Sequence, residues 1–168
     1  MLNALFSFIG TTKPQSAQVL PVVIFMAFCV KAYINNLGYR HIENWPEIEK
    51  KKWSKKIKLL HKTQSIHPDW QGKELSFATE LFSLRDRLAH GKPERVEGKT
   101  FDSLAKAQEH IVSSDFEPSW FKSLDSKWYV EAQRKFSQLM EYLVRLHKLS
   151  PTDYYHASTN TFCVADDQ

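Results

Sequence analysis

An arginine, an aspartate and a histidine lie close together near the middle of this 168-residue chain. Arg85 and Asp86 are followed by His90, and Gly91 comes directly after the histidine. An arginine guanidinium binds phosphate oxygens through its planar set of donors, and a histidine moves protons near neutral pH. A metal-free site that breaks phosphodiester bonds needs both kinds of group, because the cation stabilises the transition state and the imidazole transfers protons. Arg85 and His90 are therefore candidate catalytic residues.

The apolar pattern around this cluster predicts a helix that begins near Lys73 and ends at the capping signal Gly91. At 100° per residue its apolar side chains fall on one continuous arc. The arc contains Phe77, Ala78, Leu81, Phe82, Leu84, Leu88 and Ala89. Arg85 falls in the middle of the arc, where a charge is costly unless it is paired. Two interpretations stay open: an ion pair with an acid elsewhere in the fold, or a functional site.

The spacing of Arg85 and His90 bears on how such a site could form. Five residues on a helix turn two side chains about 140° away from each other. The two groups therefore do not converge well within one chain. Two copies of the helix, packed antiparallel across a two-fold axis, would bring four groups into one cleft, so we expect a homodimer.

The composition predicts one all-α domain. A chain of 168 residues with 42% hydrophobic and 25% charged residues is typical of a globular domain with a sizeable core. Only five glycines, against eleven phenylalanines and five tryptophans, favour long helices and few tight turns. The net charge of +4 is compatible with a polyanionic partner. Cys29 lies in an apolar run and Cys163 in a polar tail, which favours reduced thiols and a cytoplasmic location.

Helical periodicity predicts an up-and-down bundle of four main helices plus short extra helices, with its core at about 15–149 in a single domain over 1–168. The main helices are expected at about Gln18–Leu37, Asn44–Lys62, Lys73–Gly91 and Ser126–Leu149. Short helices are expected at Met1–Gly10 and Ser103–Val112. We expect irregular chain at Lys92–Lys99 and Ser114–Leu124, and an irregular tail at 150–168.

The first main helix contains the apolar run Val19–Val30, which is ended by Lys31. Twelve apolar residues are too few to cross a bilayer, which needs about 20. The N-terminus also lacks the positive charge and cleavage site of a signal peptide. We therefore expect no membrane segment and a helix at the centre of the bundle, with Gly38 as its stop signal.

The second main helix is expected to begin with Asn44 as N-cap and Glu47 completing a capping box. Its surface is crowded with lysines, among which Trp53 is interleaved. Such a run is either a solvated face or a surface that contacts phosphates and stacks on bases. If RNA is the ligand, the expected contacts are Lys50, Lys51, Lys55, Lys56, Arg87 and Lys92.

The segment Arg85–His90 resembles the signature of HEPN domains (higher eukaryotes and prokaryotes nucleotide-binding): an arginine, four to six residues, then a histidine, often with a polar residue after the arginine. Ala32–Asn35 also resembles an early core helix of that family. The resemblance implies a helical dimer with a composite, metal-independent endoribonuclease site and no cofactor. Arg85 would bind the scissile phosphate, His90 would act as general acid and base, and Asp86 would orient Arg85 or the partner's groups. The substrate's own 2′-hydroxyl would attack the phosphate.

Members of this family act as toxins or defence nucleases, or have lost activity and only bind. The resemblance therefore implies RNA, a second copy and an antitoxin or nucleotidyltransferase as partners. No tyrosine follows His90 before Tyr129, so tyrosine modification by such a transferase is not carried over. The alternatives are a non-catalytic dimeric module that binds RNA, a nucleotide or a partner protein, and a purely structural dimer in which Arg85 is paired and closed off from solvent.

Other patterns predict no site. Gly98–Lys99–Thr100 lacks the upstream glycine and the strand of a phosphate-binding loop. His61, His67 and Asp69 lack the spacing of metal ligands on one helix face, so no metal is expected.

Overall fold

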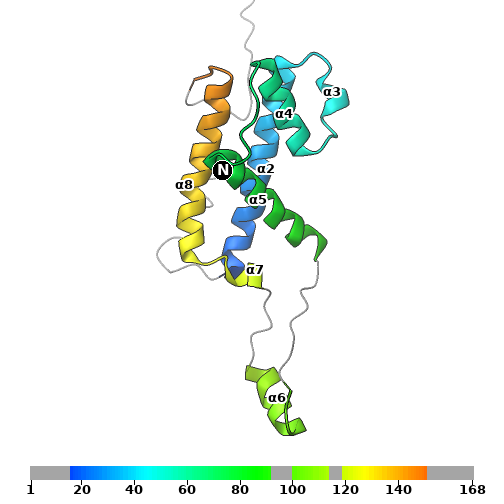
Figure 1. Ribbon diagram of the computed structural model, residues 1–168, viewed down its shortest axis with the longest axis vertical. Coiled ribbons are helices and arrows are strands. Elements are labelled where there is room, and N and C mark those ends of the chain that lie inside the picture. Colours follow the sequence, from blue (N-terminus) through cyan, green and yellow to red (C-terminus); the bar gives the residue numbers. More distant parts are fainter. Residues whose placement is uncertain (1–15, 92–99, 114–118, 151–168) are drawn as a thin grey trace, which may run out of the picture.

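The computed structural model describes residues 16–91, 100–113 and 119–150. Within these ranges the chain forms seven helices and no strand (Figure 1). The helices are α2 (Ser16–His41), α3 (Trp45–Ile48), α4 (Trp53–Thr63), α5 (Lys73–His90), α6 (Leu104–Ser113), α7 (Ser119–Lys122) and α8 (Ser126–Leu146). The predicted all-α bundle is confirmed. The expected helix Met1–Gly10, the loop Lys92–Lys99 and the tail 151–168 lie outside the described residues.

Helix α2 is the central element, because it packs against α3, α4, α5 and α8. Its core-facing side chains are fully or almost fully buried: Val19, Val22, Val23, Met26, Ala27, Val30, Ile34 and Leu37. The prediction of a central helix is confirmed on this side only, since Phe25 and Phe28 are 37% and 54% exposed on the other.

The apolar part of α2 is also longer than the run Val19–Val30 suggested. Among the described residues, one segment, Val19–His41, is long and apolar enough to cross a membrane, and 44% of its most apolar window is buried in the bundle. Core helices and signal sequences pass the same test of length and composition. The expected absence of a membrane segment stays a prediction.

The prediction that Gly38 ends this helix is wrong, because α2 continues to His41. Gly38 is instead the place where the ring of Trp45 contacts the helix backbone. A Cβ atom at position 38 would overlap the ring carbons of Trp45, which is fully buried. The glycine is required here by close approach of a neighbouring side chain rather than by a turn.

The helix expected from Asn44 to Lys62 is interrupted at residues 49–52, giving α3 and α4. Asn44 makes no capping hydrogen bond from its side chain, so the predicted capping box is wrong. Lys52 has an extended conformation, with φ −57° and ψ 140°, and α4 begins directly after it. The break allows two tryptophans to pack separately: Trp45 lies against Gly38, and Trp53 stacks on Phe82 with ring centroids 4.4 Å apart.

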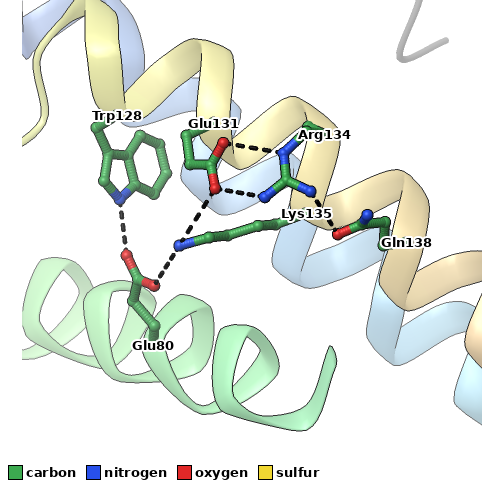
Figure 2. A network of polar contacts seen from close by, with 6 residues as sticks. All are labelled: Glu80, Trp128, Glu131, Arg134, Lys135 and Gln138. Atoms are coloured by element: carbon green, nitrogen blue, oxygen red, sulfur yellow. Dashed lines mark hydrogen bonds and ion pairs between the residues drawn. The ribbon is translucent and has the colours of Figure 1, made fainter. Parts of the chain in front are cut away.

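The middle of α5 packs against the first half of α8. As Figure 2 shows, the Trp128 indole N–H donates to Glu80 Oε1 (2.8 Å), and Lys135 Nζ lies 4.0 Å from Glu80 Oε2. Lys135 also approaches Glu131, whose carboxylate is held by Arg134. These contacts hold α5 along α8 at the level of Glu80, ten residues before His90.

The core face of α8 is formed by side chains at helical spacing from Tyr129, which is buried, to Val144, whereas Trp128 is only partly buried. The helix is capped by Asp125, whose side chain accepts a hydrogen bond from the backbone N–H of Trp128 (2.8 Å). It ends at Leu146, three residues before the predicted end.

The predicted helix Ser103–Val112 is confirmed within one residue at each end as α6, which lies apart from the bundle in Figure 1. The expectation of irregular chain at Ser114–Leu124 is wrong for Ser119–Lys122, which forms the single turn α7. The same segment reaches the core at Leu124, which is fully buried.

Candidate functional site

The predicted helix Lys73–Gly91 is confirmed as α5 with its capping glycine. Gly91 has a left-handed conformation (φ 53°), and its N–H donates to the Arg87 carbonyl (3.0 Å). The buried face runs from Leu75 to Leu84, Leu88 is partly buried, and Ala89 is exposed. The predicted apolar arc is therefore correct up to Leu84 and wrong at Ala89. The last turn extends beyond the packed part of the bundle (Figure 1).

Arg85 lies at the border between the buried face and this exposed turn. Its Nη1 atom forms an ion pair with Asp86 Oδ1 (2.8 Å), and its side chain is 28% exposed. Its Nε atom is buried and has no hydrogen-bond partner among the described residues. Arg85 is thus paired with its own neighbour rather than with a distant acid, and it is not closed off from solvent.

His90 is exposed at the end of α5. No hydrogen bond or ion pair joins its side chain to another residue that the structure describes. Together with Asp86 and Arg87 it lines an open groove of about 1130 Å³ between α5 and α4, which we call the α4–α5 groove. Arg85 does not line it. Within one chain, the structure brings three of the predicted residues to one groove and places Arg85 outside it.

The α4 side of the groove differs from the predicted basic surface. The lysines that line it are Lys52 and Lys58. The predicted contacts Lys50, Lys51 and Lys55 are exposed but lie outside the groove lining. Lys92 lies outside the described residues.

The expected surface position of Lys56 is wrong, because its side chain is fully buried. Its Nζ atom donates to Asn35 Oδ1 (2.7 Å) and lies 5.8 Å from the centroid of the Trp45 ring. Burial lowers the pKa of Lys56, nearby Lys31 lowers it further, and Glu49 opposes the change. This lysine connects α4 to α2 and is not available to a ligand.

The sequence interpretation missed the polar stripe on α5 that lines the groove. Ser76, Thr79 and Ser83 follow one another at intervals of three and four residues, and Arg87 and His90 continue the series. This spacing puts side chains on one helix face, so the same periodicity that identified the apolar arc could have identified the stripe. Trp70, from the loop before α5, was also missed, because nothing local in the sequence places a loop residue.

Three other histidines gather where α2, α4 and α8 end. The rings of His41 and His147 stack with centroids 4.3 Å apart, and His61 is fully buried beside Tyr142. The His61 Nδ1–H donates to the Ile57 carbonyl (2.8 Å), so its Nε2 accepts from the Tyr142 hydroxyl. Within the described residues, no three His, Cys, Asp or Glu side chains are placed to hold a metal ion.

Burial lowers the pKa of all three of these histidines. The change is largest for His147, whose pKa falls to about 4 through burial and through the neighbouring His41 and His61. The His147 side chain is 6% exposed, and its Nε2 atom has no partner among the described residues. These histidines are therefore neutral near pH 7, and His61 and His147 are part of the packed structure, whereas His41 is exposed.

No family model, curated protein or solved structure matches this chain. The resemblance to HEPN domains therefore depends on the residues around Arg85–His90.

Proposed function

We propose that this protein is a metal-independent endoribonuclease of the HEPN type, with a catalytic site composed of residues from two copies of the chain. The observation that carries the proposal is the position of His90. It is an exposed histidine, without a partner in the described part of the chain, and it lines a groove that also carries Arg87, Lys52 and Lys58. A proton-transfer group beside a cationic groove suits a polyanionic substrate.

In the proposed reaction the RNA supplies its own nucleophile. One His90 accepts the proton of the 2′-hydroxyl as the hydroxyl oxygen attacks the adjacent phosphorus, and the imidazolium so formed donates a proton to the departing 5′-oxygen. The bond between phosphorus and the 5′-oxygen breaks, which leaves a 2′,3′-cyclic phosphate and a 5′-hydroxyl. Arg85 stabilises the charge on the phosphate oxygens, and Asp86, 2.8 Å from Arg85 Nη1, orients the guanidinium.

The need for a second copy follows from the direction of the two catalytic side chains. Arg85 lies outside the groove that His90 lines, and the two positions are turned about 140° apart on the helix. A second α5, packed antiparallel against the exposed last turn, would place its own Arg85 near the first His90. The homodimer is therefore part of this proposal.

The test is cleavage of single-stranded RNA in the presence of a metal chelator. We expect cyclic-phosphate ends from the wild-type protein and a loss of about 100-fold or more for His90→Ala. Arg85→Ala should lose a similar factor. His67→Ala, which removes another exposed histidine, is the matched control and should retain full activity. Intact RNA with the wild-type protein, across many sequences, would contradict the proposal.

Mixing the two inactive variants tests the composite site directly. A dimer of one Arg85→Ala chain and one His90→Ala chain keeps one intact Arg85 and one intact His90 on different chains. We expect the mixture to regain part of the wild-type activity if each site takes its arginine and its histidine from different copies. No recovery in a mixture that forms mixed dimers would contradict this arrangement.

The second candidate is a non-catalytic RNA-binding module of the same fold. It is favoured by the α4–α5 groove, which is complete within one chain, and by the ion pair that already occupies Arg85. RNA that is bound but not cut by the wild-type protein would favour this function over catalysis.

A further inference from the structure

Two tryptophans lie in the α4–α5 groove. One face of the Trp53 ring is covered, because it stacks on Phe82 with an interplanar angle of 13° and a centroid distance of 4.4 Å. Trp70 stands edge-on to Trp53, with centroids 5.8 Å apart and an interplanar angle of 71°. Both rings are partly exposed and both line the groove. Partly exposed aromatic rings held in fixed positions can stack with unpaired bases.

The charges around these rings are positive. Lys52 and Lys58 line the groove on either side of Trp53 in the sequence, and Arg87 lines it from α5. The one carboxylate in the lining, Asp86, is paired with Arg85. Interleaved cations and aromatic rings are what sequence-tolerant binding of single strands uses, since the cations contact the phosphates and the rings contact the bases.

The floor of the groove along α5 is polar. The hydroxyls of Ser76, Thr79 and Ser83 follow one helix face towards His90. The Thr79 hydroxyl donates to the Leu75 carbonyl (2.9 Å), so its oxygen remains able to accept a hydrogen bond. His90 lies fourteen positions after Ser76, so the stripe covers about 21 Å of helix, which is long enough for several successive nucleotides.

We propose that the α4–α5 groove binds single-stranded RNA on one side of the scissile phosphate, with an unpaired base stacked on Trp70 and phosphates contacted by Lys52 and Lys58. The position of the scissile phosphate at His90 rests on the proposed function, whereas binding in the groove does not require catalysis. A duplex is a poor ligand for this groove, because its bases are stacked on one another and not free to stack on Trp70.

Binding is measured by fluorescence anisotropy of a labelled single-stranded RNA, with His90→Ala protein so that no cleavage intervenes. Trp70→Ala should weaken binding about 10-fold, within the range for one base stacked on an aromatic side chain. Trp70→Phe keeps an aromatic face and should retain most of the affinity. If Trp70→Ala does not fold, Trp70→Leu against Trp70→Phe makes the same comparison between an aliphatic and an aromatic side chain.

The lysines allow a matched comparison within one short segment. Lys52→Glu with Lys58→Glu changes two groove residues, and Lys51→Glu with Lys55→Glu changes two exposed lysines outside the groove lining. Both pairs change the net charge by the same amount, so a purely non-local electrostatic effect would weaken binding equally. We expect the groove pair to weaken binding at least about 10-fold more and to reduce the salt dependence more strongly.

Three results would overturn the proposal: equal losses from the two lysine pairs, unchanged affinity in the aliphatic variant of Trp70, or equal affinity for a duplex of the same sequence. These results are separate from those that test catalysis. Groove-dependent binding without cleavage would support this inference and contradict the proposed function. Cleavage that depends on His90 but not on Trp70, Lys52 or Lys58 would support the proposed function and contradict this inference.

Discussion

Two histidine-bearing regions of the described chain, the ends of α2, α4 and α8 on one side and the last turn of α5 on the other, differ in almost every physical respect. His41, His61 and His147 lie where α2, α4 and α8 end, in contact with other rings and with lowered pKa values. His90 lies on the exposed last turn of α5, with no partner in the described part of the chain. The comparison separates histidines that stabilise the fold from one that is available for chemistry.

The same difference appears in the contacts around them. At the histidine cluster, the contacts join segments far apart in the sequence: the Tyr142 hydroxyl on α8 donates to His61 on α4, and the ring of His41 stacks on that of His147. On the last turn of α5, the polar contacts among described residues are local to the helix itself, through the Arg85–Asp86 pair and the Gly91 cap. The first region therefore takes part in the packing between helices, and the second can change its partners at little cost to the fold.

The largest effect is expected from acid titration of the histidine cluster. The pKa of His147 is about 4 in the folded protein, below the value of about 6.5 expected for an unfolded chain. The unfolded state therefore binds more protons between these values, so the free energy of unfolding falls as the pH is lowered from about 6.5 to about 4. His147 alone accounts for about 3 kcal/mol, measured by urea unfolding across this pH range.

His147→Phe is the control, because it keeps a ring against His41 but removes the titrating group. Its unfolding free energy should depend less steeply on pH than that of the wild type between about 4 and 6.5. If the unfolding free energies of His147→Phe and the wild type depended equally steeply on pH, the lowered pKa of His147 would be contradicted.

The next largest effect on the free energy of unfolding is expected from Gly38→Ala, which adds one methyl group. The new Cβ would overlap the buried ring of Trp45, and such overpacking costs about 1–3 kcal/mol. Because alanine is favoured over glycine inside a helix by about 1 kcal/mol, we expect a net loss of about 2 kcal/mol or less in the free energy of unfolding, measured by chemical denaturation.

The matched substitution in the other region is Gly91→Ala. A Cβ there would meet no atom of the described residues within 4 Å, and the left-handed backbone is unfavourable for alanine, at about 1 kcal/mol. The overlap in Gly38→Ala also displaces a fully buried tryptophan, so the near-ultraviolet circular dichroism of this variant should differ from that of the wild type. The spectrum of Gly91→Ala should not. Identical spectra for both variants would contradict the difference in packing.

The smallest effect on stability is expected from Asp86→Asn. It removes an ion pair whose two side chains are 28% and 49% exposed, and exposed pairs contribute about 0–1 kcal/mol. The free energy of unfolding should change by less than about 1 kcal/mol, while RNA cleavage should fall if Asp86 orients Arg85. A loss of stability above 2 kcal/mol, on the order of a broken buried pair, would place this turn in the packed part of the protein.

The long helices could be predicted because their signals are local. Apolar residues at helical spacing identified α5 and α8, and Gly91 marked the end of α5. The role of Gly38 could not be predicted, because it depends on Trp45, which packs against it only in the folded chain. The same holds for Lys56, whose partner Asn35 is on another helix.

The site was predictable to a similar degree. Helical periodicity is sufficient to put Asp86, Arg87 and His90 near one another at the end of one helix. The opposite wall of the groove was not predictable, because the break at residues 49–52 changes which lysines of the following helix face α5. As a result Lys52 and Lys58 line the groove in place of the expected Lys50, Lys51 and Lys55.

The contact between Gly38 and Trp45 has a consequence for how sequences of this fold can vary. The ring of Trp45 occupies the volume that any side chain at position 38 would need. A larger residue at position 38 is therefore compatible with this packing only where position 45 carries a smaller one. Among homologous chains the two positions should covary, and a glycine at 38 should accompany a large aromatic residue at 45.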